Sequence, residues 1–168
     1  EPLFFCHDEL IARAKAVDPD AAKPLVLLTS PQGKLLKQKQ VRELAAEVKH
    51  MIIFCGHYKG FDERFVENCV DLEISVGDYI LSGGELAAMI MVDALTRLLP
   101  GAISRIESAD TDSLEDGLLD APVYTRPAEF RGMKIPEVLL SGHHAKIDSW
   151  RQNEREQRTA RKRPDLLE

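Results

Sequence analysis

The sequence contains few aromatic residues and no excess of positive charge. Aromatic residues make up 6% of the 168 residues, which disfavours a surface built to stack many single-stranded bases. The formal net charge of −6 disfavours a protein that coats nucleic acid through bulk positive charge. No apolar run approaches the roughly 20 residues of a membrane span, so we expect no membrane association. The remaining composition, 44% hydrophobic and 30% charged, is typical of a globular domain.

Motifs of several common enzyme classes are also absent. The three cysteines, Cys6, Cys55 and Cys69, form no C-x-x-C pair, which favours a reduced, cytoplasmic compartment over a disulfide framework or a zinc site. None of the five histidines shows metal-site spacing, so no metal-binding residue is predicted. The glycine-rich segments 56–60 and 77–84 match neither a P-loop nor G-x-G-x-x-G. An ATPase, a conventional dinucleotide enzyme and a zinc hydrolase are therefore disfavoured.

Hydrophobic periodicity predicts alternating helices and strands. Amphipathic patterns predict helices over residues 7–17, 40–49, 62–69 and 85–99. The first of these patterns places Leu10, Ile11, Ala14 and Val17 on one helical face. Short apolar runs predict buried strands over residues 25–28, 51–55 and 72–76. This order predicts an α/β fold with a parallel sheet.

Three loops follow the predicted strands and converge on one edge of that sheet. They are Ser30–Gly33, which has strong turn chemistry, and the glycine-rich segments 56–60 and 77–84. Ligands of open α/β sheets bind at the carboxyl ends of the strands, and glycine lets the backbone approach a flat ligand closely. Each glycine taken alone could simply close a turn. Together the loops indicate a small-molecule site, with the turn interpretation still open.

The chain ends and local charge predict a piece of a longer protein. The chain begins at Glu1 without an initiator Met, and it stops directly after a basic stretch. Residues 151–163 carry six Arg or Lys against two Glu, which predicts a basic helix. Such a helix could approach nucleic-acid phosphates or be an ordinary solvated face. Residues 107–120 are instead rich in Asp and Glu.

Two charged residues have both a structural and a functional interpretation. Arg97 follows Asp93 by one helical turn, so an i,i+4 ion pair worth about 0.3–0.5 kcal/mol is the simpler explanation. Asp112 precedes Ser113-Leu114-Glu115, a pattern typical of a helix N-cap. The residues alone favour the structural interpretation of both.

Several motifs resemble one enzyme family over nearly the whole chain. They are L-T-S-P-Q-G (28–33), C-G-H-Y-K-G-F-D-E-R (55–64), I-S-V-G-D-Y-I-L-S-G-G-E-L (74–86), T-R-P (125–127) and V-L-L-S-G-H-H-A (138–145). In this order they resemble the bacterial tRNA (guanine-N1)-methyltransferases, the TrmD family. The stretch from Gly77 to Glu85 is the most specific of them.

The resemblance implies a fold and a cofactor. The fold would be that of the SPOUT methyltransferases, a parallel-sheet α/β domain with a deep trefoil knot, which is a rare exception to the rule against threaded chains. S-adenosylmethionine would be the methyl donor, and Mg²⁺ is associated with the family's activity. Matching positions imply that the cofactor-binding residues are Leu28, Thr29, Ser30, Pro31, Gly56, Tyr58, Ser75, Val76, Gly77, Asp78, Tyr79, Ile80, Leu81, Gly83 and Gly84.

The resemblance also implies a reaction and partners. A cytoplasmic homodimer with an active site shared between subunits would methylate N1 of the guanosine immediately 3′ of the tRNA anticodon, position 37. Asp112 aligns with the family's base and Arg97 with its guanidinium. A free aspartate is a weak base for the N1 proton, so stabilisation by Arg97 of the charge developing toward O6 would assist its removal. The alternatives are a related SPOUT enzyme with another RNA target and a non-catalytic RNA- or cofactor-binding module.

The chain departs from the family pattern in two places and covers only part of it. Lys59 stands where Glu is common, and Ala87 where Pro is common. The family's first strand would precede Glu1, and its tRNA-gripping helical domain would follow Glu168. We therefore expect a catalytic domain over residues 1–150, a basic linker over 151–168, and poor tRNA binding by this stretch alone.

Overall fold

The computed structural model describes residues 1–102 and 112–167. The chain divides into two compact units, Glu1–Ile106 and Glu107–Glu168. The first unit contains, in order, α1 (Pro2–Val17), β1 (Leu25–Leu35), α2 (Gln38–Glu47), β2 (Met51–Cys55), α3 (Glu63–Cys69), β3 (Leu72–Ser75) and α4 (Glu85–Thr96). This order confirms the predicted alternation of helices and strands.

The sheet of the first unit is parallel and has the strand order β2-β1-β3. The central strand β1 pairs with β2 from Leu25 opposite Met51 to Thr29 opposite Cys55. It leaves β3 after Thr29 and rejoins it at Lys34. Gly33 makes this return possible, because a Cβ there would overlap the backbone of Glu73. The strand is therefore longer than the predicted 25–28, and the Ser30–Gly33 turn is an excursion within it.

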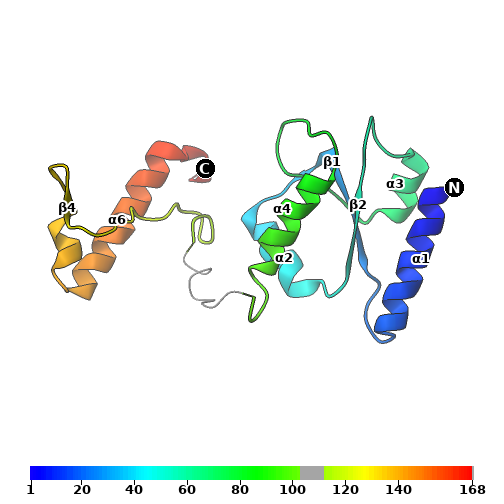
Figure 1. Cartoon of the computed structure of the whole chain (residues 1–168), viewed down its shortest axis with the longest axis horizontal. Coiled ribbons are helices and arrows are strands. Elements are labelled where there is room, and N and C mark those ends of the chain that lie inside the picture. Colours follow the sequence, from blue (N-terminus) through cyan, green and yellow to red (C-terminus); the bar gives the residue numbers. More distant parts are fainter. Residues whose placement is uncertain (103–111, 168) are drawn as a thin grey trace. The chain divides into compact units, whose positions relative to one another are not determined.

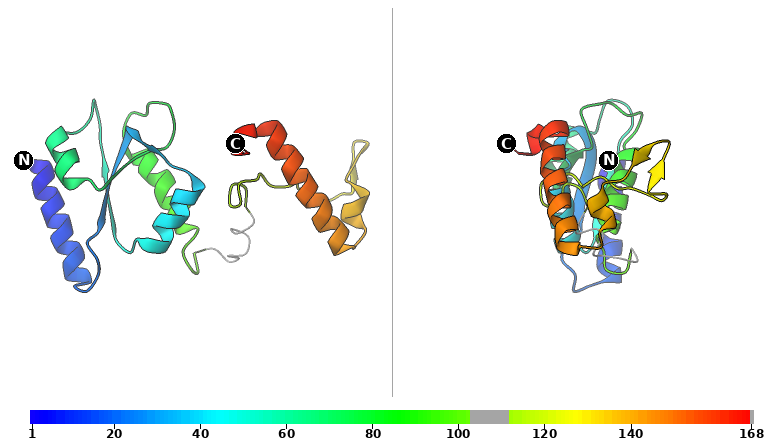
Figure 2. Two further views of the ribbon diagram at one scale, coloured as in Figure 1. Left: turned by 180° about the vertical axis from the view of Figure 1, so that it is seen from behind. Right: turned by 90° about the vertical axis from the view of Figure 1, so that its left-hand side faces the viewer.

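Helices cover both faces of this sheet. Figures 1 and 2 show α1 and α3 on one side of the strands and α2 and α4 on the other. Alternate residues of β1 supply the two cores: Val26 and Leu28 join the cluster under α1 and α3, and Leu27 joins the cluster under α2 and α4. This alternation follows from the two-residue period of a strand. It explains why the run reads as continuously apolar in the sequence.

Val17, which the sequence places on the same helical face as Leu10 and Ile11, does not pack with them and is 80% exposed. Helix α1 begins at Pro2, earlier than predicted, and Pro is well tolerated in the first turn of a helix. Its contacts to the core come from Leu3, Phe4, Leu10 and Ile11. The last turn, where Val17 lies, extends beyond that contact.

The second unit consists of a hairpin and a long helix. The hairpin strands are β4 (Glu129–Phe130) and β5 (Met133–Lys134), and they are followed by η1 (Glu137–Leu140), α6 (His144–Lys162) and η2 (Pro164–Leu166). The predicted basic helix is therefore present, but it begins at His144 and runs without a break across the 150/151 boundary. None of the helices in the described part of the chain is both long and apolar enough to cross a membrane.

Candidate functional site

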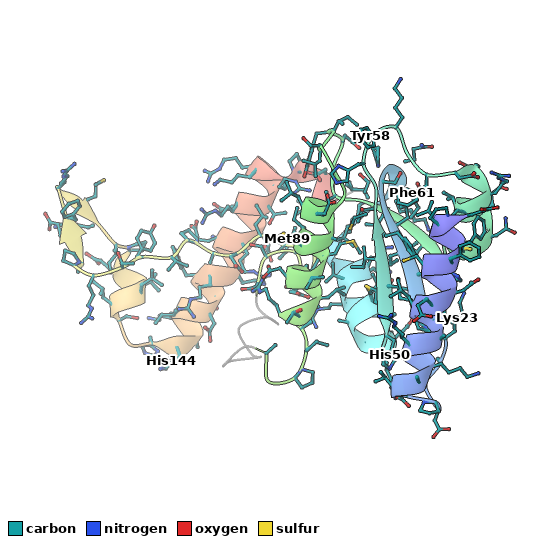
Figure 3. All side chains as sticks on the ribbon, turned by 45° about the vertical axis from the view of Figure 1, so that its right-hand side comes forward. Lys23, His50, Tyr58, Phe61, Met89 and His144 are labelled. Atoms are coloured by element: carbon teal, nitrogen blue, oxygen red, sulfur yellow. The ribbon has the colours of Figure 1, made fainter. Side chains whose placement is uncertain are left out.

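The first unit has a cavity of about 450 Å³ beside the Ser30–Gly33 excursion of β1 and the carboxyl ends of β2 and β3. In Figure 3, Tyr58 and Phe61 lie at this end of the unit, and Lys23 and His50, which precede β1 and β2, lie at the opposite end. The cavity is lined by all three of the loops predicted to converge there. Every residue assigned to the cofactor by resemblance lines it, except Asp78.

The three loops around the cavity lie close together because Gly84, which has no side chain, packs between them. Gly84 lies directly against β2, where an added Cβ would contact the Thr29 hydroxyl, the Cα of Cys55 at 3.0 Å and the backbone nitrogen of Gly56 at 3.1 Å. The Gly84 N–H donates to the Gly56 carbonyl at 2.9 Å. Thr29 Oγ1 lies 3.3 Å from the carbonyl oxygens of both Phe54 and Gly84. These contacts bring together three segments that are far apart in the sequence.

A side-chain pair reinforces the same junction. His57 Nε2 lies 2.7 Å from Glu85 Oε1, which joins the loop after β2 to the first turn of α4. His57 also forms an isolated antiparallel bridge with Gly83. The backbone N–H of Glu85, and then His57, lower the pKa of the Glu85 carboxyl, so it is ionised at neutral pH. His57 lines the cavity but was not predicted as a site residue; its place in the 56–60 loop was the available signal.

The third loop is held by its own hydrogen bonds. Ser75 Oγ donates to the Gly77 carbonyl at 3.0 Å and lies 3.2 Å from the Gly77 N–H, which donates to it. The Tyr79 hydroxyl donates to the Val76 carbonyl at 3.3 Å. Backbone groups of this loop are thus fixed along one wall of the cavity. A wall of this kind offers hydrogen bonds to a ligand without requiring charged side chains.

The cavity has a mixed lining suited to a flat, polar ligand. Apolar residues such as Val76, Ile80 and Leu81 lie in the lining together with backbone groups of the glycine loops. Tyr58 is fully exposed and has a positive φ of 63°, so its ring projects from the loop. Lys59 is also among the lining residues. Burial raises the pKa of the Cys55 thiol, which is consequently protonated at neutral pH.

The structure places the two predicted catalytic residues in different units. Arg97 follows α4 as its C-cap in the first unit, and Asp112 lies in the second. The helix predicted after Asp112 is wrong: residues 113–118 form turns, although the Glu115 N–H does donate to the Asp112 carbonyl at 3.4 Å. The Leu114 N–H donates to the Leu118 carbonyl at 2.8 Å and closes the chain into a loop. Within residues 1–102 and 112–167, no group of three or more His, Cys, Asp or Glu could hold a metal ion.

Comparison with known proteins assigns the chain to a family. Residues 6–168 match the family model described as tRNA (Guanine-1)-methyltransferase TrmD. The chain belongs to this family. It is 58% identical over 168 residues to the tRNA (guanine-N(1)-)-methyltransferase of Brevibacillus brevis, covering all of this chain and 65% of the relative. The proteins of the same name from Shouchella clausii and Listeria monocytogenes are 56% and 50% identical over 167 residues, covering 99% of this chain and 65% and 66% of the relatives.

Membership in the TrmD family confirms the resemblance drawn from the sequence motifs. The chain spans about two thirds of the length of these curated relatives. The motif residues 55–64 and 74–86, which carried that resemblance, supply most of the cavity lining. The most specific part of the sequence therefore coincides with the cavity.

Proposed function

We propose that this chain is the catalytic part of a tRNA (guanine-N1)-methyltransferase. Its substrates would be S-adenosylmethionine and a tRNA with guanosine immediately 3′ of the anticodon, position 37. The observation that carries the proposal is the cavity at the carboxyl ends of the strands, which is lined by the family's motif loops. The relatives' shared name supports the same reaction.

The cavity fits S-adenosylmethionine in size and in chemistry. Ligand cavities of this kind span about 300–1,000 Å³, and this one is about 450 Å³. Gly84 packs against Thr29, Cys55 and Gly56 and so holds the loops around the cavity together. The backbone of the 75–81 loop is available for the polar edge of an adenine. Apolar contacts from lining side chains that are not buried in the cores, such as Ile80, suit its faces. When bound, the cofactor supplies an electrophilic methyl group on a sulfonium, so the protein contributes mainly alignment and exclusion of water.

The roles of Arg97 and Asp112 follow from the nucleophile. Guanine N1 carries a proton and is a poor nucleophile until that proton leaves. Asp112 would accept the proton, and Arg97 would stabilise the negative charge that develops toward O6.

A homodimer is the proposed assembly. The apolar residues Leu86, Met89 and Ile90 lie three and four positions apart on α4 and are 58%, 66% and 47% exposed. Figure 3 labels Met89 on this helix. An exposed apolar stripe of this kind marks an interaction surface, and we propose a second copy of the chain as its occupant. The dimer would be cytoplasmic, each subunit would contain the trefoil knot of the SPOUT fold, and residues 151–168 would lead to a tRNA-binding domain.

Methyl transfer to defined tRNAs tests this proposal. The full-length protein is incubated with methyl-labelled S-adenosylmethionine and with tRNA that carries either guanosine or adenosine at position 37, with and without Mg²⁺. We expect label only in the guanosine tRNA, at N1. Equal labelling of the two tRNAs would favour a SPOUT enzyme with another RNA target. Cofactor binding without any transfer would favour a non-catalytic module.

A further inference from the structure

The loop from Asp112 to Asp120, here called the acidic loop, is closed by its own hydrogen bonds. The Leu118 N–H donates to Asp116 Oδ1 at 3.2 Å, and the Asp120 N–H donates to Ser113 Oγ at 2.9 Å. Leu114 has a positive φ of 78°, which reverses the chain direction at the start of the loop. The residue next to Asp112 is thus tied to the far end of the loop. A displacement of the loop would carry Asp112 with it.

An ion pair attaches the acidic loop to helix α6. Arg155 Nη2 donates to Asp116 Oδ1 at 2.5 Å. The Arg155 side chain is only 18% exposed, far less than a surface arginine. Its Nε is buried without a hydrogen-bond partner in the described part of the chain. The two terminal nitrogens of the guanidinium donate instead, Nη2 to Asp116 and Nη1 to Gln152 Oε1 at 3.3 Å. The hydrogen bond from Arg155 lowers the pKa of the Asp116 carboxyl, which keeps this pair charged at neutral pH.

A second attachment lies one helical turn further along α6. Thr159 is 0% exposed, and its Oγ1 accepts the Leu119 N–H at 2.9 Å. The same hydroxyl donates to the Arg155 carbonyl at 2.7 Å, so both of its hydrogen-bonding functions are used. Residues four apart lie on the same face of a helix. Arg155 and Thr159 therefore hold the acidic loop at two points on one face of α6.

We propose that Arg155 and Thr159 are positioning residues for the reaction, because they fix the loop that begins with Asp112. This inference rests on the proposed function, in which Asp112 accepts the guanine N1 proton. Displacement of a catalytic group by about 1 Å can cost about 100-fold in rate. The two attachments restrain the loop through side chains of α6. Helix α6, which carries the basic residues, would therefore also hold the proposed base Asp112 in place.

The test compares variants of the full-length protein in single-turnover methyl transfer at saturating S-adenosylmethionine and tRNA. We expect Arg155→Ala and Thr159→Val to lower the rate constant at least 10-fold, with the Kd for S-adenosylmethionine changed less than twofold. Thr159→Ser retains the hydroxyl and should restore the rate to within about threefold. Asp116→Asn removes the same ion pair from the exposed side, so it should reproduce the Arg155→Ala loss even if Arg155→Ala folds poorly. Gln157→Ala removes an exposed side-chain hydrogen bond from α6 and should leave the rate unchanged.

Amide hydrogen exchange supplies a readout that is independent of activity. Exchange at Leu118–Asp120 should accelerate in Arg155→Ala and Thr159→Val and should be normal in Thr159→Ser. Faster exchange with an unchanged transfer rate would overturn the inference, because the attachments would then stabilise the loop without positioning Asp112. A rate loss matched by an equal loss of cofactor affinity would overturn it as well. If the wild-type protein transfers no methyl group, the proposed function itself fails, and the exchange data still report whether the loop is attached.

Discussion

Gly84 gives the sharpest test of how the cavity is built. Its φ of −78° and ψ of −9° are accessible to alanine, so Gly84→Ala introduces no backbone strain. The change restricts the unfolded chain, which stabilises by about 0.4–1 kcal/mol. Against this, the new methyl would press on Thr29 Oγ1 and on backbone atoms of Cys55 and Gly56 at 3.0 and 3.1 Å, none of which can rotate away freely. Overpacking of this kind costs about 1–3 kcal/mol, so we expect a net loss of about 1–2 kcal/mol in unfolding free energy.

The same displacement should separate the loop at 56–60 from the start of α4 and widen the cavity between them. We expect the Kd for S-adenosylmethionine, measured by calorimetry, to rise at least 10-fold, which corresponds to about 1.4 kcal/mol. Gly101→Ala is the matched control: its φ of 79° imposes a strain of about 1–2 kcal/mol, but nothing lies within 4 Å of the added methyl. The control should therefore lose similar stability in urea unfolding and keep its affinity. Unchanged affinity in Gly84→Ala, or an equal affinity loss in both variants, would refute the close-packing argument.

Three further predictions concern charged groups. Asp112→Asn should lower single-turnover methyl transfer by about 10²–10⁴-fold with little change in cofactor Kd, because it removes the proposed proton acceptor; an undiminished rate would eliminate that role. Hydrogen bonds from Arg64 lower the pKa of Asp62 to about 2, so Asp62 stabilises the fold above its unfolded-state pKa of about 3.9 and this contribution is lost as pH falls to 2. The Tm of Asp62→Asn should lie below that of the wild type at pH 6 and converge with it near pH 2; a difference that persists at pH 2 would contradict this. Reversing the charge of Arg158, Arg161 and Arg163 should weaken tRNA binding and reduce its salt dependence, while S-adenosylmethionine affinity stays unchanged. Unaffected tRNA binding would show that these residues form an ordinary solvated face.

The sheet could be predicted because its signals are local. The run Met51–Cys55 is apolar throughout and bounded by Gly56, and the observed strand has these same limits. The far end of β1 could not be predicted in the same way. Lys34 and Leu35 return to β3 only because Gly33 fits against the backbone of Glu73, and a sequence pattern does not record such a contact between distant segments.

Local patterns failed where a contact from elsewhere in the chain decides the conformation. The sequence after Asp112 has the composition of a helix start, yet Asp116 is bound by Arg155 and the Leu119 N–H by Thr159. These two partners lie about 40 positions away in sequence and on a helix. A short helix offers only marginal stability by itself, so a closed loop fixed by distant side chains can replace it.

The cavity could be located from the sequence, but its ligand could not be identified from side-chain chemistry. Its position follows from the rule that parallel strands present their loops at one edge. Its polar contacts come largely from the backbone of glycine-rich segments, and backbone groups are the same in every protein. What distinguishes this cavity is the positions that cannot hold a side chain, such as Gly84. Those positions follow from how the loops pack against one another. For this reason the proposal of S-adenosylmethionine as the ligand is supported by the family match and not by composition or charge.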